Sequence, residues 1–169
     1  MKYGIAIFPS KKLQDLVNSY RKRYDPQYSM IPPHITLKYS FEASEEQMKD
    51  ITKQLWETAA KTEPINLNVL KASTFQPVSN VIYLKVELNN ELETLQKQLH
   101  NGINSEDEFA FVPHLTLAQQ LSNDEHSDLF GQLSMIDLSH SETIDRFHLL
   151  YQLDNGSWTV YETFHLGKE

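Results

Sequence analysis

The sequence predicts an α+β fold in which two lobes, related by a pseudo-twofold axis, place mainly antiparallel sheets around a central cleft and helices outside. A five-residue phrase occurs twice, as Pro33-His34-Ile35-Thr36-Leu37 and Pro113-His114-Leu115-Thr116-Leu117, with its histidines 80 positions apart. Each copy precedes a helix-start pattern and follows an apolar run and a helix-like stretch. This matched order indicates an internal duplication, although little sequence identity remains outside the phrase.

Length and composition predict a single domain. A chain of 169 residues with 40% hydrophobic content can bury roughly 70% of the surface that its unfolded form exposes. It contains no cysteine, so no disulfide scaffold is available. Segment 76–80 contains Pro77 and has no apolar pattern. We therefore expect it to divide domain 1–169 into lobe-forming halves of 1–76 and 81–169.

Strands are predicted where apolar and polar residues alternate and where β-branched and aromatic residues gather. These strands span 3–8, 34–39, 65–71, 81–88, 114–119, 143–153 and 157–166. The last two flank Asn155-Gly156. An Asn-Gly step between strands is typical of a tight hairpin, because both residues tolerate positive φ.

Helices are predicted where apolar residues recur at helical spacing. The stripes are Leu13, Leu16, Val17 and Tyr20; Met48, Ile51, Leu55 and Ala59; and Leu92, Leu95 and Leu99. Ser44 with Gln47, and Ser122 with Glu125, have the spacing of capping boxes. They predict the starts of the second and fourth helices.

Helix ends are indicated by Gly102 and Gly131, placed where glycines commonly end the third and fourth helices. The basic run Arg21-Lys22-Arg23 falls at the end of the first. We interpret it first as a solvated helix terminus whose cations complement the helix dipole. A contact with a phosphorylated ligand is the alternative, because the run lies shortly before His34.

Composition and motifs exclude several classes of function. The formal net charge of −8 argues against binding extended duplex nucleic acid, which needs many Lys and Arg residues. Neither a Walker loop nor a GxGxxG motif is present. The apolar run Ile5–Phe8 is much shorter than a signal-peptide core or membrane span. We expect a soluble cytoplasmic protein, and the absence of cysteine fits that compartment.

The repeated phrase predicts one site built from two strands. Successive side chains of a strand point to opposite faces, so His34 and Thr36 share one face, and His114 and Thr116 share another. Ile35, Leu37, Tyr39, Leu115 and Leu117 occupy the opposite, anchoring faces. A single His-x-Thr is more often an ordinary polar strand face. Two copies at matched positions favour a common pocket.

Two histidines and two threonines suit cleavage of a phosphodiester. In-line displacement needs a base at the attacking oxygen and an acid at the leaving oxygen. Because the pKa of histidine is about 6.5, one imidazole can be neutral while the other is protonated near neutral pH. The hydroxyls of Thr36 and Thr116 can donate to the non-bridging oxygens. This chemistry requires no metal and no cofactor.

Other polar and aromatic residues have two interpretations each. Lys38 continues the face of His34 and Thr36, and is either a phosphate ligand or a rim residue. Four aromatic residues could stack on a base or belong to the core: Tyr39, Phe75, Phe111 and Trp158. The remaining histidines lack metal-ligand spacing: His100, His126, His140, His148 and His165. His148 and His165 lie on the hairpin strands and could approach the cleft.

The paired strand-borne His-x-Thr phrases resemble the 2H phosphoesterase superfamily. Within it, Met1–Pro9 and Ile31-Pro32-Pro33-His34-Ile35-Thr36 resemble the YjcG-like phosphoesterases of Gram-positive bacteria. The resemblance implies a fold of the RNA ligase and cyclic phosphodiesterase type. It implies His34 as proton donor, His114 as acceptor, and phosphate-binding roles for Thr36 and Thr116. The substrate it implies is a cyclic phosphodiester, often a 2′,3′-cyclic phosphate.

The expected function is that of a metal-independent phosphoesterase acting on a small nucleotide or an RNA end. Its reaction could also run in the direction of ligation. A non-catalytic nucleotide or RNA-end binding module with the same cleft is the first alternative. A metal-dependent hydrolase using the remaining histidines is the second. The sequence predicts no membrane partner, and it specifies neither the base nor the oligomeric state.

Overall fold

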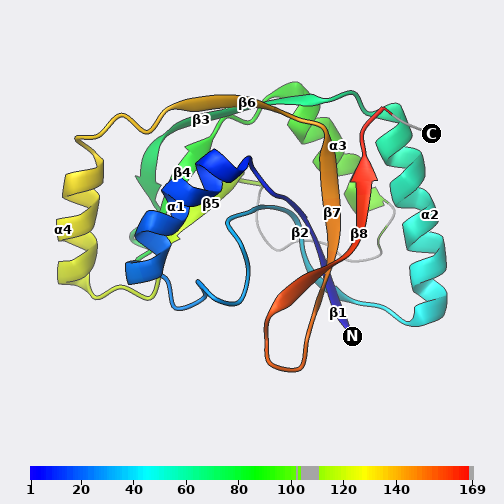
Figure 1. Cartoon of the computed structure of the whole chain (residues 1–169), viewed down its shortest axis with the longest axis horizontal. Helices are drawn as coiled ribbons and strands as arrows, with labels where there is room; N and C mark the ends of the chain where they lie inside the picture. Colours follow the sequence, from blue (N-terminus) through cyan, green and yellow to red (C-terminus); the bar gives the residue numbers. More distant parts are fainter. Residues whose placement is uncertain (102, 104–110, 168–169) are drawn as a thin grey trace.

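The computed structural model describes residues 1–101, 103 and 111–167, and its elements follow the predicted order (Figure 1). The first half comprises β1 (Lys2–Ile7), α1 (Lys11–Tyr24), β2 (Ile35–Glu42), α2 (Glu45–Lys61) and β3 (Ile65–Thr74). The second comprises β4 (Ile82–Val86), α3 (Asn90–Asn101), β5 (His114–Ala118), α4 (Asn123–Leu133) and β6 (His140–Ile144). β7 (Arg146–Gln152) and β8 (Trp158–His165) complete the described fold.

Two four-stranded antiparallel sheets form the α+β architecture. One has the strand order β2-β1-β7-β8 and the other β5-β4-β3-β6. β3 therefore leaves the first half to pair with β4, and β7 leaves the second half to pair with β1. The predicted lobe boundary at residues 76–80 thus does not coincide with the division between the sheets. The periodicity of the sequence indicates where strands lie but not which strands pair, so it does not predict this exchange.

The helices also cross between the halves. α1 packs against β5, and α3 packs against β2. α2 lies beside β8, while α4 lies at the opposite end of the molecule near β3 (Figure 1). The buried faces of α1, α2 and α3 include most of the predicted stripes. Leu16 is the exception, since it is 37% exposed.

Local capping explains where α2 and α4 begin. The Ser44 hydroxyl accepts a hydrogen bond from the Gln47 backbone, and the Gln47 side chain accepts one from the Ser44 backbone. Ser122 and Glu125 repeat this arrangement. Both predicted capping boxes are confirmed.

The prediction that Gly131 ends α4 is wrong. Gly131 lies inside α4, which is capped at its end by Ser134 in a right-handed helical conformation. The Ser134 hydroxyl donates to the Phe130 carbonyl at 2.7 Å, so no left-handed glycine is needed there. Gly102 lies outside the described residues.

The C-terminal strands confirm the hairpin and revise one strand. Gly156 has a φ of +90° and lies between β7 and β8, as the Asn-Gly step predicts. The predicted strand 143–153 is two strands instead, separated at Asp145. The chain changes sheets there, since β6 pairs with β3 and β7 pairs with β1. Asp145 is the single turn-favouring residue at this point, with no Gly or Pro beside it, so the sequence marks the break only weakly.

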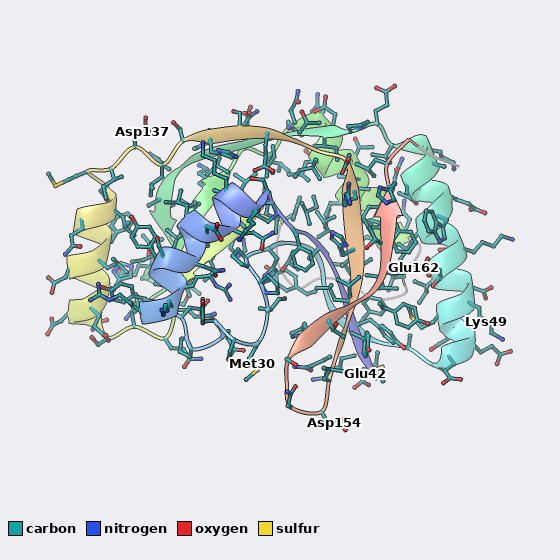
Figure 2. All side chains as sticks on the ribbon, in the orientation of Figure 1. Met30, Glu42, Lys49, Asp137, Asp154 and Glu162 are labelled. Atoms are coloured by element: carbon teal, nitrogen blue, oxygen red, sulfur yellow. The ribbon has the colours of Figure 1, made fainter. Side chains whose placement is uncertain are left out.

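Figure 2 labels Glu42, Lys49, Asp137 and Asp154 near the outer edges of the view, and Glu162 between β8 and α2. No helix within the described ranges is long and apolar enough to cross a membrane.

Candidate active site

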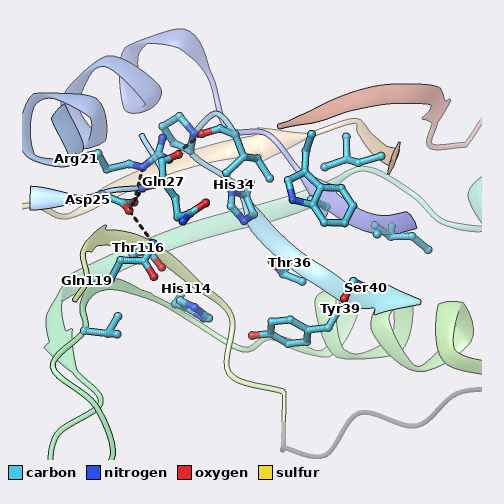
Figure 3. A pocket seen from close by; sticks show the side chains of 18 of the residues that line it. Arg21, Asp25, Gln27, His34, Thr36, Tyr39, Ser40, His114, Thr116 and Gln119 are labelled. Carbon is cyan, nitrogen blue, oxygen red and sulfur yellow. Dashed lines mark hydrogen bonds and ion pairs between the residues drawn. The ribbon is translucent and has the colours of Figure 1, made fainter. Parts of the chain in front are cut away.

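Both copies of the repeated phrase line one pocket of about 420 Å³. The pocket lies where the edge strands β2 and β5 of the two sheets approach each other. His34, Thr36, His114 and Thr116 all face it (Figure 3). The structure therefore brings the four residues predicted from the sequence to a single site.

Each histidine ring is held by the same local contact. His34 Nδ1 lies 2.8 Å from the Pro32 carbonyl oxygen, and His114 Nδ1 lies 2.6 Å from the Val112 carbonyl oxygen. A carbonyl oxygen only accepts, so each Nδ1 bears the hydrogen and each neutral ring keeps its lone pair on Nε2. Pro32 and Val112 each precede a buried proline, which favours extended backbone. Two matched imidazoles result, and within the described part of the chain neither Nε2 has a hydrogen-bond partner.

Burial lowers the pKa of both histidines. It lowers the pKa of His34 to about 4, and the charges of Arg21 and His114 act in the same direction. The Pro32 hydrogen bond and the Asp25 carboxylate oppose this shift only in part. Burial also lowers the pKa of His114. Both rings are therefore neutral at pH 7 in the unliganded protein, and a bound phosphate anion would raise both pKa values.

Aromatic side chains explain the burial of His114. Its ring meets Phe75 at 5.2 Å and Tyr83 at 5.3 Å between centroids, in edge-to-face geometry. Phe75 also lines the pocket, as do Tyr39 and Trp158. Three of the four aromatic candidates thus reach the site. Phe111 packs against the core instead.

Lys38 lines the pocket as the strand alternation predicts, and an irregularity in β2 adds Tyr39 to it. The pairing of β1 with β2 shifts register on both sides of the Ile5–Lys38 pair. The simple alternation is therefore broken: Lys38 is buried and Tyr39 is 52% exposed. Both residues line the pocket. The prediction that Tyr39 anchors the opposite face is wrong, because strict alternation holds only in a regular strand.

Sequence reasoning missed a buried ion pair beside the histidines. Arg21 is 2% exposed and Asp25 is 6% exposed. Arg21 Nε lies 3.1 Å from Asp25 Oδ2. Both line the pocket together with Gln27 and Gln119. The solvated-terminus interpretation is therefore wrong for Arg21, although Lys22 and Arg23 are exposed. The i, i+4 spacing of Arg21 and Asp25 was the available signal.

Three of the other described histidines have structural partners away from the pocket. His126 bonds Thr74, His140 bonds Glu142, and His148 bonds Thr163. Within residues 1–101, 103 and 111–167, no three His, Asp or Glu side chains are grouped so as to hold a metal ion. His148 also packs on Phe8, with ring centroids 4.8 Å apart.

The two sheets exchange the strands β3 and β7 between the halves of the chain, and each presents a His-x-Thr strand to a common pocket. These features define the class of 2H phosphoesterases. Residues 8–156 match the model of the 2′-5′ RNA ligase superfamily. The chain belongs to this superfamily, and it is an enzyme of the phosphoesterase type.

Relatives agree with this assignment, and two solved structures have a similar fold. A protein of Bacillus licheniformis named "Putative phosphoesterase" is 58% identical over 168 residues, which cover 99% of each chain. A Geobacillus kaustophilus protein of the same name is 59% identical, covering 99% of this chain and 97% of its own. The protein TT0787 of Thermus thermophilus superposes over 100% of both chains with a TM-score of 0.74 and 18% identity. E. coli LigT complexed with 3′-AMP covers 98% of this chain and 97% of its own, with a TM-score of 0.73 and 16% identity. These two structures establish the similarity of fold.

Proposed function

We propose that this phosphoesterase hydrolyses a cyclic phosphodiester, such as the 2′,3′-cyclic phosphate of a small nucleotide or RNA end. The observation behind the proposal is the matched orientation of His34 and His114 in one pocket. Each ring is fixed through Nδ1 and keeps Nε2 free for proton transfer. A reaction that moves one proton in and one proton out needs two such groups.

The proposed reaction proceeds by in-line attack. One imidazole Nε2 takes a proton from water, whose oxygen forms a bond to phosphorus. The bond from phosphorus to one ring oxygen breaks, and the other imidazole, protonated at Nε2, donates its proton to that oxygen. By resemblance to the superfamily, His114 is the acceptor and His34 the donor. Thr36 and Thr116 bind the non-bridging oxygens, whose negative charge grows in the transition state.

Pocket size and lining support a small nucleotide substrate. A volume of about 420 Å³ falls within the roughly 300–1,000 Å³ of small-molecule sites. Tyr39, Phe75 and Trp158 offer aromatic surface on which a base can stack. LigT, which has a similar fold, was crystallised with the mononucleotide 3′-AMP. The net charge of −8 disfavours a long polyanionic substrate.

The test is turnover of a defined panel by the purified full chain. The panel contains 2′,3′-cyclic mononucleotides of all four bases, 3′,5′-cyclic nucleotides, and short RNAs ending in a 2′,3′-cyclic phosphate. Chromatography and ³¹P NMR identify the monophosphate formed. We expect ring opening of at least one 2′,3′-cyclic phosphate. Tight binding without product across the panel would instead favour a non-catalytic binding module.

A further inference from the structure

The buried ion pair Arg21 and Asp25 lines the pocket that the two motif strands share. Arg21 is on the last turn of α1, and Asp25 caps that helix, its backbone N–H donating to the Arg21 carbonyl. Arg21 Nε donates to Asp25 Oδ2 at 3.1 Å. Figure 3 shows the pair at the edge of the pocket, above Thr116 and Gln119. A buried ion pair needs further hydrogen bonds to satisfy its remaining polar atoms, and here they lead in two directions.

Arg21 connects the pair to the His34 strand. Its Nη2 donates to the Ile31 carbonyl at 2.7 Å. The next carbonyl along the chain, that of Pro32, accepts the hydrogen bond from His34 Nδ1. The guanidinium therefore holds the peptide immediately before the one that orients His34. A lysine could not make the same contacts, because only the planar guanidinium donates in several fixed directions.

Asp25 connects the pair to the His114 strand. Its Oδ1 accepts a hydrogen bond from Gln119 Nε2 at 2.7 Å. Gln119 directly follows β5, and its backbone N–H donates to the Tyr24 carbonyl at 3.1 Å. Two hydrogen bonds therefore link the C-terminal end of α1 to the end of β5, the strand that presents His114 and Thr116. This contact joins the two halves of the duplication.

We propose that Arg21, Asp25 and Gln119 are positioning residues that set the placement of His34 relative to His114. None of them transfers a proton. Arg21 fixes the connection that precedes His34, and Gln119 couples the same carboxylate to the strand of His114. The proposal rests on the proposed function, because it assumes that both imidazoles act on one phosphate. It assigns the relative placement of His34 and His114 to one hydrogen-bonded network.

The experiment compares Gln119→Ala with a matched control, Gln14→Ala. Gln14 is also half-buried and also donates one Nε2 hydrogen bond, to the Pro9 carbonyl at 2.8 Å, but it does not line the pocket. Arg21→Lys is the second test variant, since it keeps the charge. Steady-state kinetics on a 2′,3′-cyclic nucleotide give kcat and KM separately. NMR titration with inorganic phosphate gives the affinity of the histidine pair without turnover.

We expect Gln119→Ala and Arg21→Lys to lower kcat about tenfold or more, since small misplacements of reacting groups are costly, with KM changed less than about threefold. The two variants should weaken phosphate binding, and Gln14→Ala should change neither quantity. In a His114→Ala background, Gln119→Ala should have no further effect on kcat, because a positioning residue acts only through the group it positions.

The outcomes separate this proposal from the proposed function. Wild-type kcat and phosphate affinity in both test variants would overturn the positioning role while leaving the catalytic role of the histidines intact. An additional full loss in the His114→Ala background would also overturn it. If no cyclic phosphate is turned over but the test variants alone weaken phosphate binding, the proposed function fails and the positioning role stands.

Discussion

His34 and His114 make the same contact in two different sheets: each Nδ1 bonds the carbonyl oxygen two residues earlier, at 2.8 and 2.6 Å. The two contacts fix the same ring orientation, and both rings line one pocket. The duplication has therefore preserved the presentation of an imidazole and not only its identity.

Replacing either histidine should remove most of the activity. His34→Gln and His114→Gln each lose one proton-transfer group, so we expect kcat on a 2′,3′-cyclic nucleotide to fall by about 10² or more. His148→Gln is the control, because His148 is half-buried on β7 but does not line the pocket. It should retain activity within a few-fold. Wild-type rates in both pocket variants would contradict the catalytic assignment.

Activity should withstand removal of divalent metal ions. The proposed reaction uses two imidazoles and two hydroxyls, and none of its steps needs a Lewis acid. Rates measured after dialysis against EDTA should equal those of untreated enzyme. Loss of activity on chelation, with recovery on adding a single divalent cation, would mean that a metal ion and not an imidazole activates the attacking water.

Two glycine substitutions should change stability in opposite directions. Gly131 is exposed inside α4, and an added Cβ meets nothing within 4 Å. Gly131→Ala should raise the free energy of unfolding by about 0.5–1 kcal/mol, the usual gain in a helix. Gly156 has a φ of +90°, so Gly156→Ala should be destabilising. Urea unfolding measures both, and a loss of stability in Gly131→Ala would contradict the helical placement.

Local patterns in the sequence predicted most of the elements, because strands, capping boxes and the Asn155-Gly156 turn depend on neighbouring residues. They did not predict the exchange of β3 and β7 between the sheets, or the change of sheet at Asp145, since pairing depends on distant partners. The four motif residues were predictable because they repeat. Arg21, Asp25 and Gln119 do not repeat, and their meeting depends on the packing of α1 against β5.

Stability should decrease as the pH falls from 6.5 toward 4. In that interval His34 takes up a proton in the unfolded chain, where its pKa is near the ordinary value of 6.5, before it does so in the folded protein, where its pKa is about 4. The unfolded state therefore binds more protons, and the free energy of unfolding rises with pH. The slope from one histidine is at most about 1.4 kcal/mol per pH unit.

The measurement is urea unfolding of wild type and His34→Gln between pH 4.5 and 7.5. Carboxylates contribute to the pH dependence of both proteins, so the difference between their slopes isolates His34. We expect the variant to have the shallower slope below pH 6.5, and the difference in slope to fade toward zero as the pH approaches 7.5. Equal slopes throughout would mean that His34 is not buried as a neutral ring.

The rate should have its optimum on the acidic side of neutrality. The sequence alone suggested one neutral and one protonated imidazole near pH 7, but burial lowers the pKa of both His34 and His114. The profile of kcat/KM reports the free enzyme. In the free enzyme the base must be neutral and the acid protonated. The two limbs of the kcat/KM profile are therefore set by the two apparent pKa values of the coupled histidines, His34 and His114. We expect both to lie below 6.5.

The profile of kcat should lie at higher pH than that of kcat/KM. A bound phosphodiester anion favours the protonated imidazole and raises its pKa, so the donor keeps its proton to higher pH in the complex. Rates across pH 4–8.5 at saturating and at low substrate concentration give the two profiles. A kcat/KM profile whose alkaline limb lies above pH 7 would contradict the lowered histidine pKa values. It would mean that the free enzyme already stabilises a protonated imidazole. A carboxylate that lies closer to His34 than the Arg21 guanidinium does would have that effect.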